Sequence, residues 1–256
     1  MKCFKRVVDL HMILIIFLSV ASTYMCISYN MASNMPTSLI GISIVFPVVF
    51  SINSAYKRRE QALGYFSDFN AHFISLFYAH RDWIPAENNR TDFQESIRSI
   101  YQGILVELST YLKKENTLTH EDSSKIYPFF SKLSKLNEKL RAAGVPANEV
   151  SRANQYLKSI IASFEKMKNF SLYRTPLTLK FSSRMFLNIF PILFGPYFAH
   201  LAANHYPAIG YLVALVYSVV LVSLDNIQSD IENPFDQNGF DDIKLDIGET
   251  YLKIMA

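Results

Sequence analysis

The sequence contains few of the residues and none of the common motifs that indicate a catalytic site or a disulfide-stabilised domain. Its 256 residues include only 8 glycines and 2 cysteines. Both cysteines, Cys3 and Cys26, lie near the N-terminus in or beside an apolar segment, and they imply no disulfide framework. The motifs GxSxG, HExxH and CxxC and the P-loop are absent. The 6 histidines are dispersed, whereas a membrane di-iron enzyme needs closely spaced pairs. We therefore expect no enzyme, and a membrane enzyme is only the third hypothesis.

The chain also lacks a large excess of positive charge. Its formal net charge is +3 at pH 7. A nucleic-acid-binding protein would need a dense basic stripe to neutralise phosphates. We therefore expect no nucleic-acid partner.

Apolar residues are concentrated in two pairs of long segments on either side of a polar middle. A helix needs roughly 20 mostly apolar residues to cross the hydrocarbon core of a bilayer, and each segment is close to that length. We predict an integral membrane protein in contact with lipid. The predicted spans are Leu10–Ser28, Met35–Asn53, Phe181–Ala203 and Tyr206–Asp225.

Basic residues near the ends of these spans predict their orientation. The cluster Lys57–Arg59 follows the second span, and Arg174 and Lys180 precede the third. The short connections within the pairs carry no Lys or Arg. By the positive-inside rule, both termini and the middle of the chain are cytoplasmic. The alternative, in which residues 1–28 are a cleaved signal peptide, would leave three spans and put the 57–59 cluster in conflict with the other charges.

The polar middle shows the spacing of helices, and the alternation typical of strands is hard to find. We predict that the second span continues into the cytoplasm as far as Ala79, that Pro85 ends this run, and that residues 144–146 separate two later helices. The apolar stripes of these helices are interpreted as core packing. The predicted fold is an all-α membrane protein with four transmembrane helices in two hairpins and a helical cytoplasmic region. Its predicted parts are a first hairpin (1–56), a cytoplasmic helical region (57–180), a second hairpin (181–225) and a cytoplasmic C-terminal segment (226–256).

The second span carries a separate periodic signal. Ile42, Phe46 and Phe50 recur every four residues and lie on one helix face, while Pro47 is expected to interrupt the hydrogen-bond ladder. In a monomer this face would be a packing stripe. In a ring of subunits it would form a narrow, dry constriction that gates conduction by dewetting. The positive edges of Phe rings would tolerate an anion better than a cation, but periodicity alone does not decide between these alternatives.

Three stretches together make the chain resemble the bestrophin family of pentameric anion channels. Residues 39–44, running on to the Tyr56-Lys57-Arg58 segment, are similar to the family's pore helix and its Tyr-x-Arg ending. Residues 173–177, which include Pro176-Leu177, look like the family's approach to the third membrane segment. Residues 231–235, which include Asn-Pro-Phe, look like the motif after the fourth membrane segment. The likeness extends from about residue 10 to 246, although Arg59-Glu60 replaces the family's paired Trp.

The resemblance implies a bestrophin-like fold and a homopentamer that conducts anions passively, with chloride as the expected permeant ion. Thr175, which precedes the Pro-Leu pair, would form the cytosolic aperture. Its hydroxyl would make a wetter filter than the apolar residue usual in the family. An alternative alignment would place the neck at Ile40, Ile44 and Val48. The preferred alignment, anchored on the Tyr-x-Arg ending, places the neck at Ile42, Phe46 and Phe50 and the pore vestibule at Asn53 and Tyr56.

The resemblance also implies a calcium clasp around Asn-Pro-Phe, as in animal members. Its ligand positions fall on Asp230, the Asn233 carbonyl, Asn238 and Asp241. Calcium prefers six to eight oxygen ligands, and carboxylates supply most of the affinity. Asn238 replaces one acidic ligand, and the alternative interpretation is a helix-ending turn with solvated acids.

A different class of function is also compatible with the predicted topology. A non-conducting four-span scaffold or assembly factor would use the soluble helices to bind partners. It would have a stoichiometry other than a closed ring and would carry no current.

Overall fold

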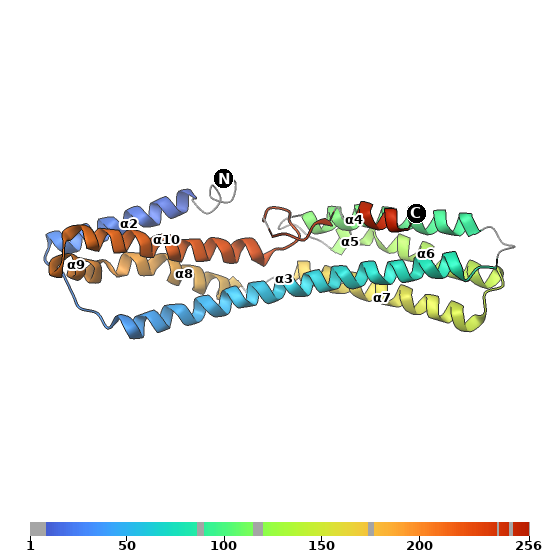
Figure 1. The fold of residues 1–256 in the computed structure, drawn as a ribbon, viewed down its shortest axis with the longest axis horizontal. Coiled ribbons are helices and arrows are strands. Elements are labelled where there is room, and N and C mark those ends of the chain that lie inside the picture. The colour runs from blue at the N-terminus through green and yellow to red at the C-terminus, as the bar shows by residue number, and fades with distance from the viewer. Residues whose placement is uncertain are drawn as a thin grey trace. The chain divides into compact units, whose positions relative to one another are not determined.

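The computed structural model describes residues 9–85, 90–114, 120–173, 177–239, 241–245 and 248–255, and within its helices the side chains of residues 37–40 and 42–47, among others, lie outside this description. The described chain is helical, and no strand occurs within it. Figure 1 shows the helices along the chain. They are α2 (Leu10–Ser28), α3 (Thr37–Asp82), α4 (Arg90–Lys113), α5 (His120–Ser124), α6 (Tyr127–Ala142), α7 (Ala147–Leu172), α8 (Leu177–Leu193), α9 (Gly195–Asn204), α10 (Pro207–Glu232) and α11 (Gly248–Ile254).

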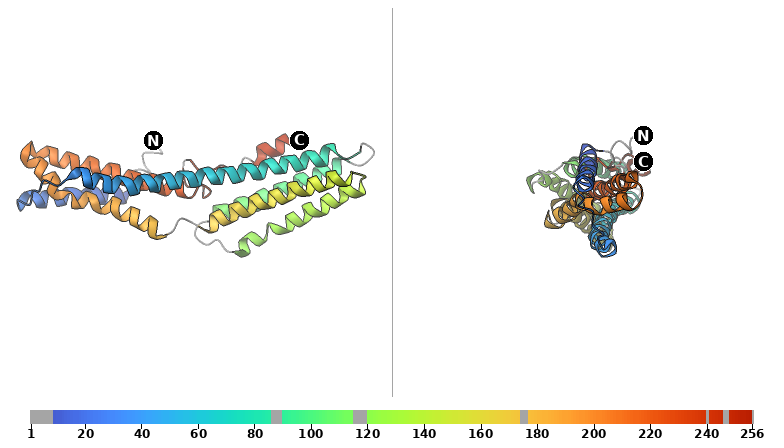
Figure 2. Two further views of the ribbon diagram at one scale, coloured as in Figure 1. Left: turned by 90° about the horizontal axis from the view of Figure 1, so that it is seen from below. Right: turned by 90° about the vertical axis from the view of Figure 1, so that its left-hand side faces the viewer.

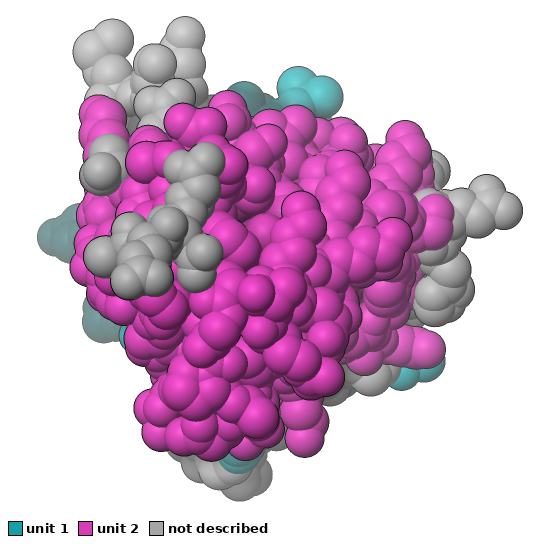
Figure 3. Space-filling view, turned by 90° about the vertical axis from the view of Figure 1, so that its right-hand side faces the viewer, with its two compact units in different colours: residues 1–58, 175–232 teal, residues 59–174, 233–256 magenta. Residues whose placement is uncertain are grey.

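The chain divides into two compact units, and each unit combines two separate stretches of sequence (Figure 3). Unit 1 contains residues 1–58 and 175–232, and unit 2 contains residues 59–174 and 233–256. The first part of α3 belongs to unit 1 and the rest belongs to unit 2.

Unit 1 contains the candidate membrane spans of the described chain. Within it, α2, α8, α9 and α10 pack against one another (Figures 1 and 2). Three stretches among the described residues are long and apolar enough to cross a bilayer, namely Leu10–Ser28, Arg184–Asn204 and Pro207–Glu232. The first has the bounds of the first predicted span, and the other two overlap the third and fourth predicted spans. Large apolar side chains on these helices, such as Phe17 and Leu212, are exposed in the single chain, as expected for surfaces that face lipid.

The third predicted span is broken at Phe194 into α8 and α9, which the sequence analysis did not anticipate. Pro196 has no N–H, so the Ile192 carbonyl loses its partner in the helical ladder. The hydroxyl of Ser22 on α2 donates to this carbonyl at 2.8 Å, and that of Ser19 donates to the Pro191 carbonyl at 2.8 Å. Neighbouring polar side chains therefore satisfy the backbone at the break, as a membrane environment requires.

Arg184 on α8 has a partner inside unit 1. In the structure its Nε lies 3.2 Å from Oδ2 of Asp225, and its Nη2 donates to the Ser229 hydroxyl at 3.2 Å. The Asp225 side chain is only 5% exposed, so the guanidinium compensates a buried carboxylate. Asp225 lies on α10, and this helix continues to Glu232, beyond the end of the fourth predicted span at Asp225.

Close packing of α9 against α10 depends on Gly210. A Cβ at this position would lie 2.5 Å from the Phe198 carbonyl oxygen and 2.8 Å from the Ala202 Cβ. Because the nearest atom belongs to the backbone, rotation of a side chain cannot relieve the clash. We expect Gly210→Ala to destabilise the protein by about 1–3 kcal/mol, measured as a lower midpoint of thermal unfolding in detergent.

Gly64 provides the matched control for this substitution. It lies in the unit 2 part of α3, and no atom would lie within 4 Å of an added Cβ. Gly64→Ala should be neutral or stabilising by up to about 1 kcal/mol, because alanine is the better helix former. An equal fall in the midpoint for both variants would show that the α9–α10 approach is not the cause.

Unit 2 is a bundle of α4, α6 and α7 with the second part of α3, built around one apolar core. The predicted separation of two helices at residues 144–146 is confirmed, because α6 ends at Ala142 and α7 begins at Ala147. Between them Gly144 has a φ of 84°, a left-handed conformation that favours glycine. There the Val145 N–H bonds back to the Leu140 carbonyl and ends α6. Fully buried aromatic and aliphatic side chains dominate the core, among them Phe69, Phe73, Tyr101, Ile104 and Phe164.

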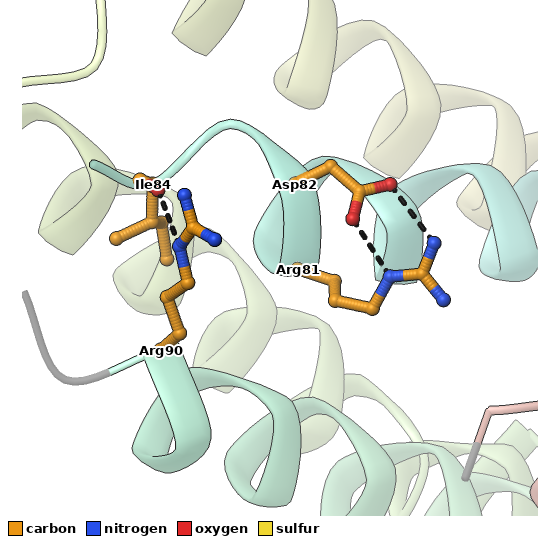
Figure 4. Close-up of polar contacts among 4 residues, drawn as sticks. All are labelled: Arg81, Asp82, Ile84 and Arg90. Carbon is orange, nitrogen blue, oxygen red and sulfur yellow. Dashed lines mark hydrogen bonds and ion pairs between the residues drawn. The ribbon is translucent and has the colours of Figure 1, made fainter. Parts of the chain in front are cut away.

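Two arginines stabilise the turn that follows α3 (Figure 4). Arg81 contacts both carboxylate oxygens of Asp82, at 2.7 and 3.0 Å, and holds the pKa of that carboxyl below its usual value. The Nε of Arg90, at the start of α4, donates to the Ile84 carbonyl at 2.7 Å. With Pro85 next in the chain, this turn ends the helix where the sequence predicted.

Candidate functional site: the exposed face of α3 and the Asn-Pro-Phe loop

The unit 1 part of α3 has one buried face and one exposed face. The helix is continuous through Pro47 and reaches Asp82. Val48 and Ala55 are 3% and 5% exposed, and both lie on the buried face. Phe50 and Tyr56 are 62% and 52% exposed, and Asn53 is exposed as well. The unit therefore leaves several of the predicted pore residues at its surface.

The exposed face changes in chemistry along the helix. Phe50 is large and apolar, Asn53 and Tyr56 carry hydrogen-bond donors, and Lys57 adds an exposed positive charge. Amide, phenol and ammonium donors are able to solvate an anion directly. Ile42 and Phe46, the other predicted neck residues, have side chains outside the described part of the chain, and Thr175 lies outside the described residues altogether.

The loop that contains Asn-Pro-Phe is closed by its own hydrogen bonds. The carboxylate of Asp236 accepts from the Asn233 side chain and from the Asn238 N–H, both at 2.9 Å. The Ile243 N–H donates to the Pro234 carbonyl at 2.8 Å. Asp236 therefore takes a structural role that the sequence analysis did not assign to it.

The loop is attached to unit 2 at two points. Phe235 is fully buried in the core, and its ring meets that of Phe170 edge-to-face at 6.0 Å between centroids. The Nε of Arg59 donates to the Asp241 carbonyl at 2.8 Å. An aromatic residue within an acidic, polar segment was the sequence signal for this anchor.

The predicted calcium ligands belong to different units of the chain. Asp230 belongs to unit 1, whereas Asn233, Asn238 and Asp241 belong to unit 2. No group of at least three His, Cys, Asp or Glu side chains among the described residues is placed to hold a metal ion. Nearby Asp236 is engaged by the loop itself. Calcium binding stays a prediction from the resemblance.

Comparison with known proteins shows similarity in structure. No protein-family model and no curated protein matches the sequence. A crystal structure of a bacterial bestrophin homologue from Klebsiella pneumoniae superposes with a TM-score of 0.75 at 17% identity, covering 96% of each chain. A variant of that homologue gives 0.76 at 18% identity, over 95% of this chain and 97% of the other. Another solved structure, described as a membrane protein, gives 0.78 at 18% identity, over 95% and 96%.

These matches extend over almost the whole of both chains. The fold implied by the sequence resemblance is thereby confirmed. The chain is an all-α membrane protein that has the fold of the bacterial bestrophin homologues.

Proposed function

We propose that the chain is the subunit of a homopentameric anion channel that conducts chloride passively. The observation that carries the proposal is the exposed face of α3, which presents Phe50, Asn53 and Tyr56 outside the single chain in a protein with the bestrophin fold. A helix surrounded by its own unit would have buried a phenylalanine at this position. If copies of α3 surrounded a common axis, Phe50 would contribute to an apolar ring, and Asn53 and Tyr56 would line a polar vestibule.

The burial pattern supports the preferred alignment of the neck. Val48 is only 3% exposed and packs in the apolar cluster of Leu187 and Phe194 within unit 1. An alignment with the neck at Ile40, Ile44 and Val48 would therefore place one lining residue inside the subunit. The alignment that includes Phe50 uses an exposed side chain.

The proposed path has three parts. Ile42, Phe46 and Phe50 would form a dry constriction that resists wetting, and the positive edges of the Phe rings would favour anions. Asn53 and Tyr56 would then solvate the ion, and Thr175 would form the cytosolic aperture. In this proposal the N-terminus, the C-terminus and unit 2 are cytoplasmic, as the distribution of Lys and Arg indicates.

Chloride efflux from proteoliposomes tests this proposal. We expect Phe50→Ala to raise the efflux rate several-fold, because a smaller side chain widens the constriction and lowers the cost of wetting it. Phe17→Ala is the matched control, since Phe17 is 70% exposed on α2, which is a candidate membrane span. It should leave efflux unchanged.

Two outcomes would contradict the proposal. If the parent protein gave no efflux, the non-conducting scaffold would be the better description. If Phe50→Ala and Phe17→Ala changed efflux equally, Phe50 would not line the constriction.

A further inference from the structure

Unit 2 contains a basic cleft that the channel proposal does not use. The cleft has a volume of about 400 Å³ and lies between α4 and α6, which pack against each other within the unit (Figure 1). Its walls contain three lysines, two serines and two aliphatic residues and no acidic residue. The lining residues are Ser96, Ser99, Ile100, Lys132, Lys135, Leu136 and Lys139.

The three lysines are brought together by helical spacing. Lys132, Lys135 and Lys139 are three and four residues apart, so they share one face of α6. Like charges at these spacings repel one another and destabilise a helix by a few tenths of a kcal/mol per pair. An arrangement of this kind is stabilised when an anion binds between the charges.

No carboxylate in the described chain neutralises these lysines. None of the three forms an ion pair with a described Asp or Glu. Glu138, the acidic residue within this stretch of α6, lies 3.8 Å from Arg141 instead. The ammonium nitrogen of Lys132 lies over the ring of Phe129, 4.9 Å from the ring centroid.

The other lining residues supply neutral donors and apolar surface. Ser96 and Ser99 on α4 add two hydroxyls to the lining, and Ile100 on α4 and Leu136 on α6 add apolar surface. Ammonium and hydroxyl donors are common ligands of phosphate oxygens. The volume is many times that of a chloride ion, so the cleft fits a larger anion with several charges.

From these observations we propose that the α4–α6 cleft binds a phosphate-bearing polyanion, such as a soluble polyphosphate or the headgroup of an anionic lipid. The inference does not rest on the channel function, because it concerns binding to unit 2 alone. The proposal assigns a ligand site to unit 2, whereas the exposed face of α3 that carries the channel proposal belongs to unit 1.

Calorimetric titration with inorganic pyrophosphate, in a chelated low-salt buffer and with the full chain in neutral-lipid nanodiscs, tests this proposal. We expect saturable binding at one site per chain, weakened by salt. The triple variant Lys132→Gln, Lys135→Gln, Lys139→Gln should bind pyrophosphate at least about tenfold more weakly, because three charge-assisted contacts are lost.

A second titration with pyrophosphate, in nanodiscs that contain phosphatidic acid, distinguishes the two sources of the phosphate group. Competition by the lipid identifies a headgroup ligand, and unchanged affinity identifies a soluble one.

The matched control removes the same charge elsewhere in unit 2. Lys125, Lys158 and Lys253 are exposed and do not line the cleft. The triple Lys→Gln variant at these positions should keep the parent affinity. Equal weakening in both triple variants, or no saturable binding of pyrophosphate to the parent, would overturn the proposal. Because all six lysines are exposed, neither variant should lower the thermal midpoint below that of the parent.

Discussion

Phe235→Ala is expected to destabilise unit 2 by about 3–5 kcal/mol, the usual cost of removing a fully buried phenylalanine. The ring is completely enclosed in the unit 2 core and packs edge-to-face on Phe170. Its removal would leave a cavity and detach the loop that Asp236 organises. The prediction is checked by the midpoint of thermal unfolding in detergent, followed through the helical circular dichroism signal.

Val106→Ala is the control for this experiment. Val106 is 59% exposed on α4, and its truncation should change stability by less than about 0.5 kcal/mol. If Phe235→Ala behaved like Val106→Ala, Asn-Pro-Phe would be a surface motif in solution, and the anchoring role assigned to its ring would be wrong.

Mild acid is expected to destabilise unit 2 through His80. This side chain is fully buried, its Nδ1 lies 2.9 Å from the Leu76 carbonyl, and the ring of Phe93 is close. Burial lowers the pKa of His80 to about 4, although the carbonyls of Leu76 and Leu136 act in the opposite direction. As the pH falls, the His80 side chain therefore binds a proton near pH 6.5 in the unfolded chain, but only near pH 4 in the folded chain.

The sign and the size of the effect follow from this difference. The contribution of neutral His80 to stability is complete above about pH 6.5 and is lost as the pH falls towards 4. The full loss is about 3–4 kcal/mol, since the pKa falls from 6.5 to about 4 and one pKa unit corresponds to about 1.4 kcal/mol. We expect the thermal midpoint to fall steeply over this range in the parent protein.

His80→Asn separates this effect from general acid denaturation. Asparagine keeps a donor for the Leu76 carbonyl and does not titrate. The variant should be less stable at neutral pH because it is smaller, but its midpoint should depend less on pH between 6.5 and 4 than that of the parent. His72→Asn, on the same helix but only half-buried, should keep the parent pH dependence. A parent-like slope in His80→Asn would refute the assignment.

The helices were largely predictable from the sequence because their apolar residues recur at helical spacing. In α4, which runs from Arg90 to Lys113, the buried residues Ile97, Tyr101, Ile104 and Leu108 recur at this spacing. The glycine and proline at 144–146 predicted the boundary between α6 and α7. Periodicity did not indicate α5 or α11, because helices of 5 and 7 residues are too short to show it.

Features that depend on tertiary contacts were not predictable in the same way. The break at Phe194 follows from Pro191 and Pro196, but its stability depends on hydroxyls from α2 that are about 170 residues away in sequence. The partner of Arg184 is 41 residues away, on another helix. The role of Asp236 depends on hydrogen bonds within the folded loop. The periodicity of apolar residues carries no information about such contacts.

The candidate pore residues were suggested by spacing and by the resemblance, and the structure adds a physical distinction among them. Periodicity showed that Phe50 shares a face with positions four and eight residues earlier, but it could not separate a lipid-facing stripe from a pore-facing one. Burial of Val48 and exposure of Phe50 show which face of α3 its own unit covers. Only the assembled protein shows what covers the other.

The most direct test of the proposed channel is therefore a cryo-electron microscopy structure of the protein purified in lipid nanodiscs. We predict five copies around one axis, with α3 innermost and Phe50, Asn53 and Tyr56 facing a central water-filled path. A particle without a central path, or one in which the Phe50 face of α3 contacts lipid, would contradict the proposal.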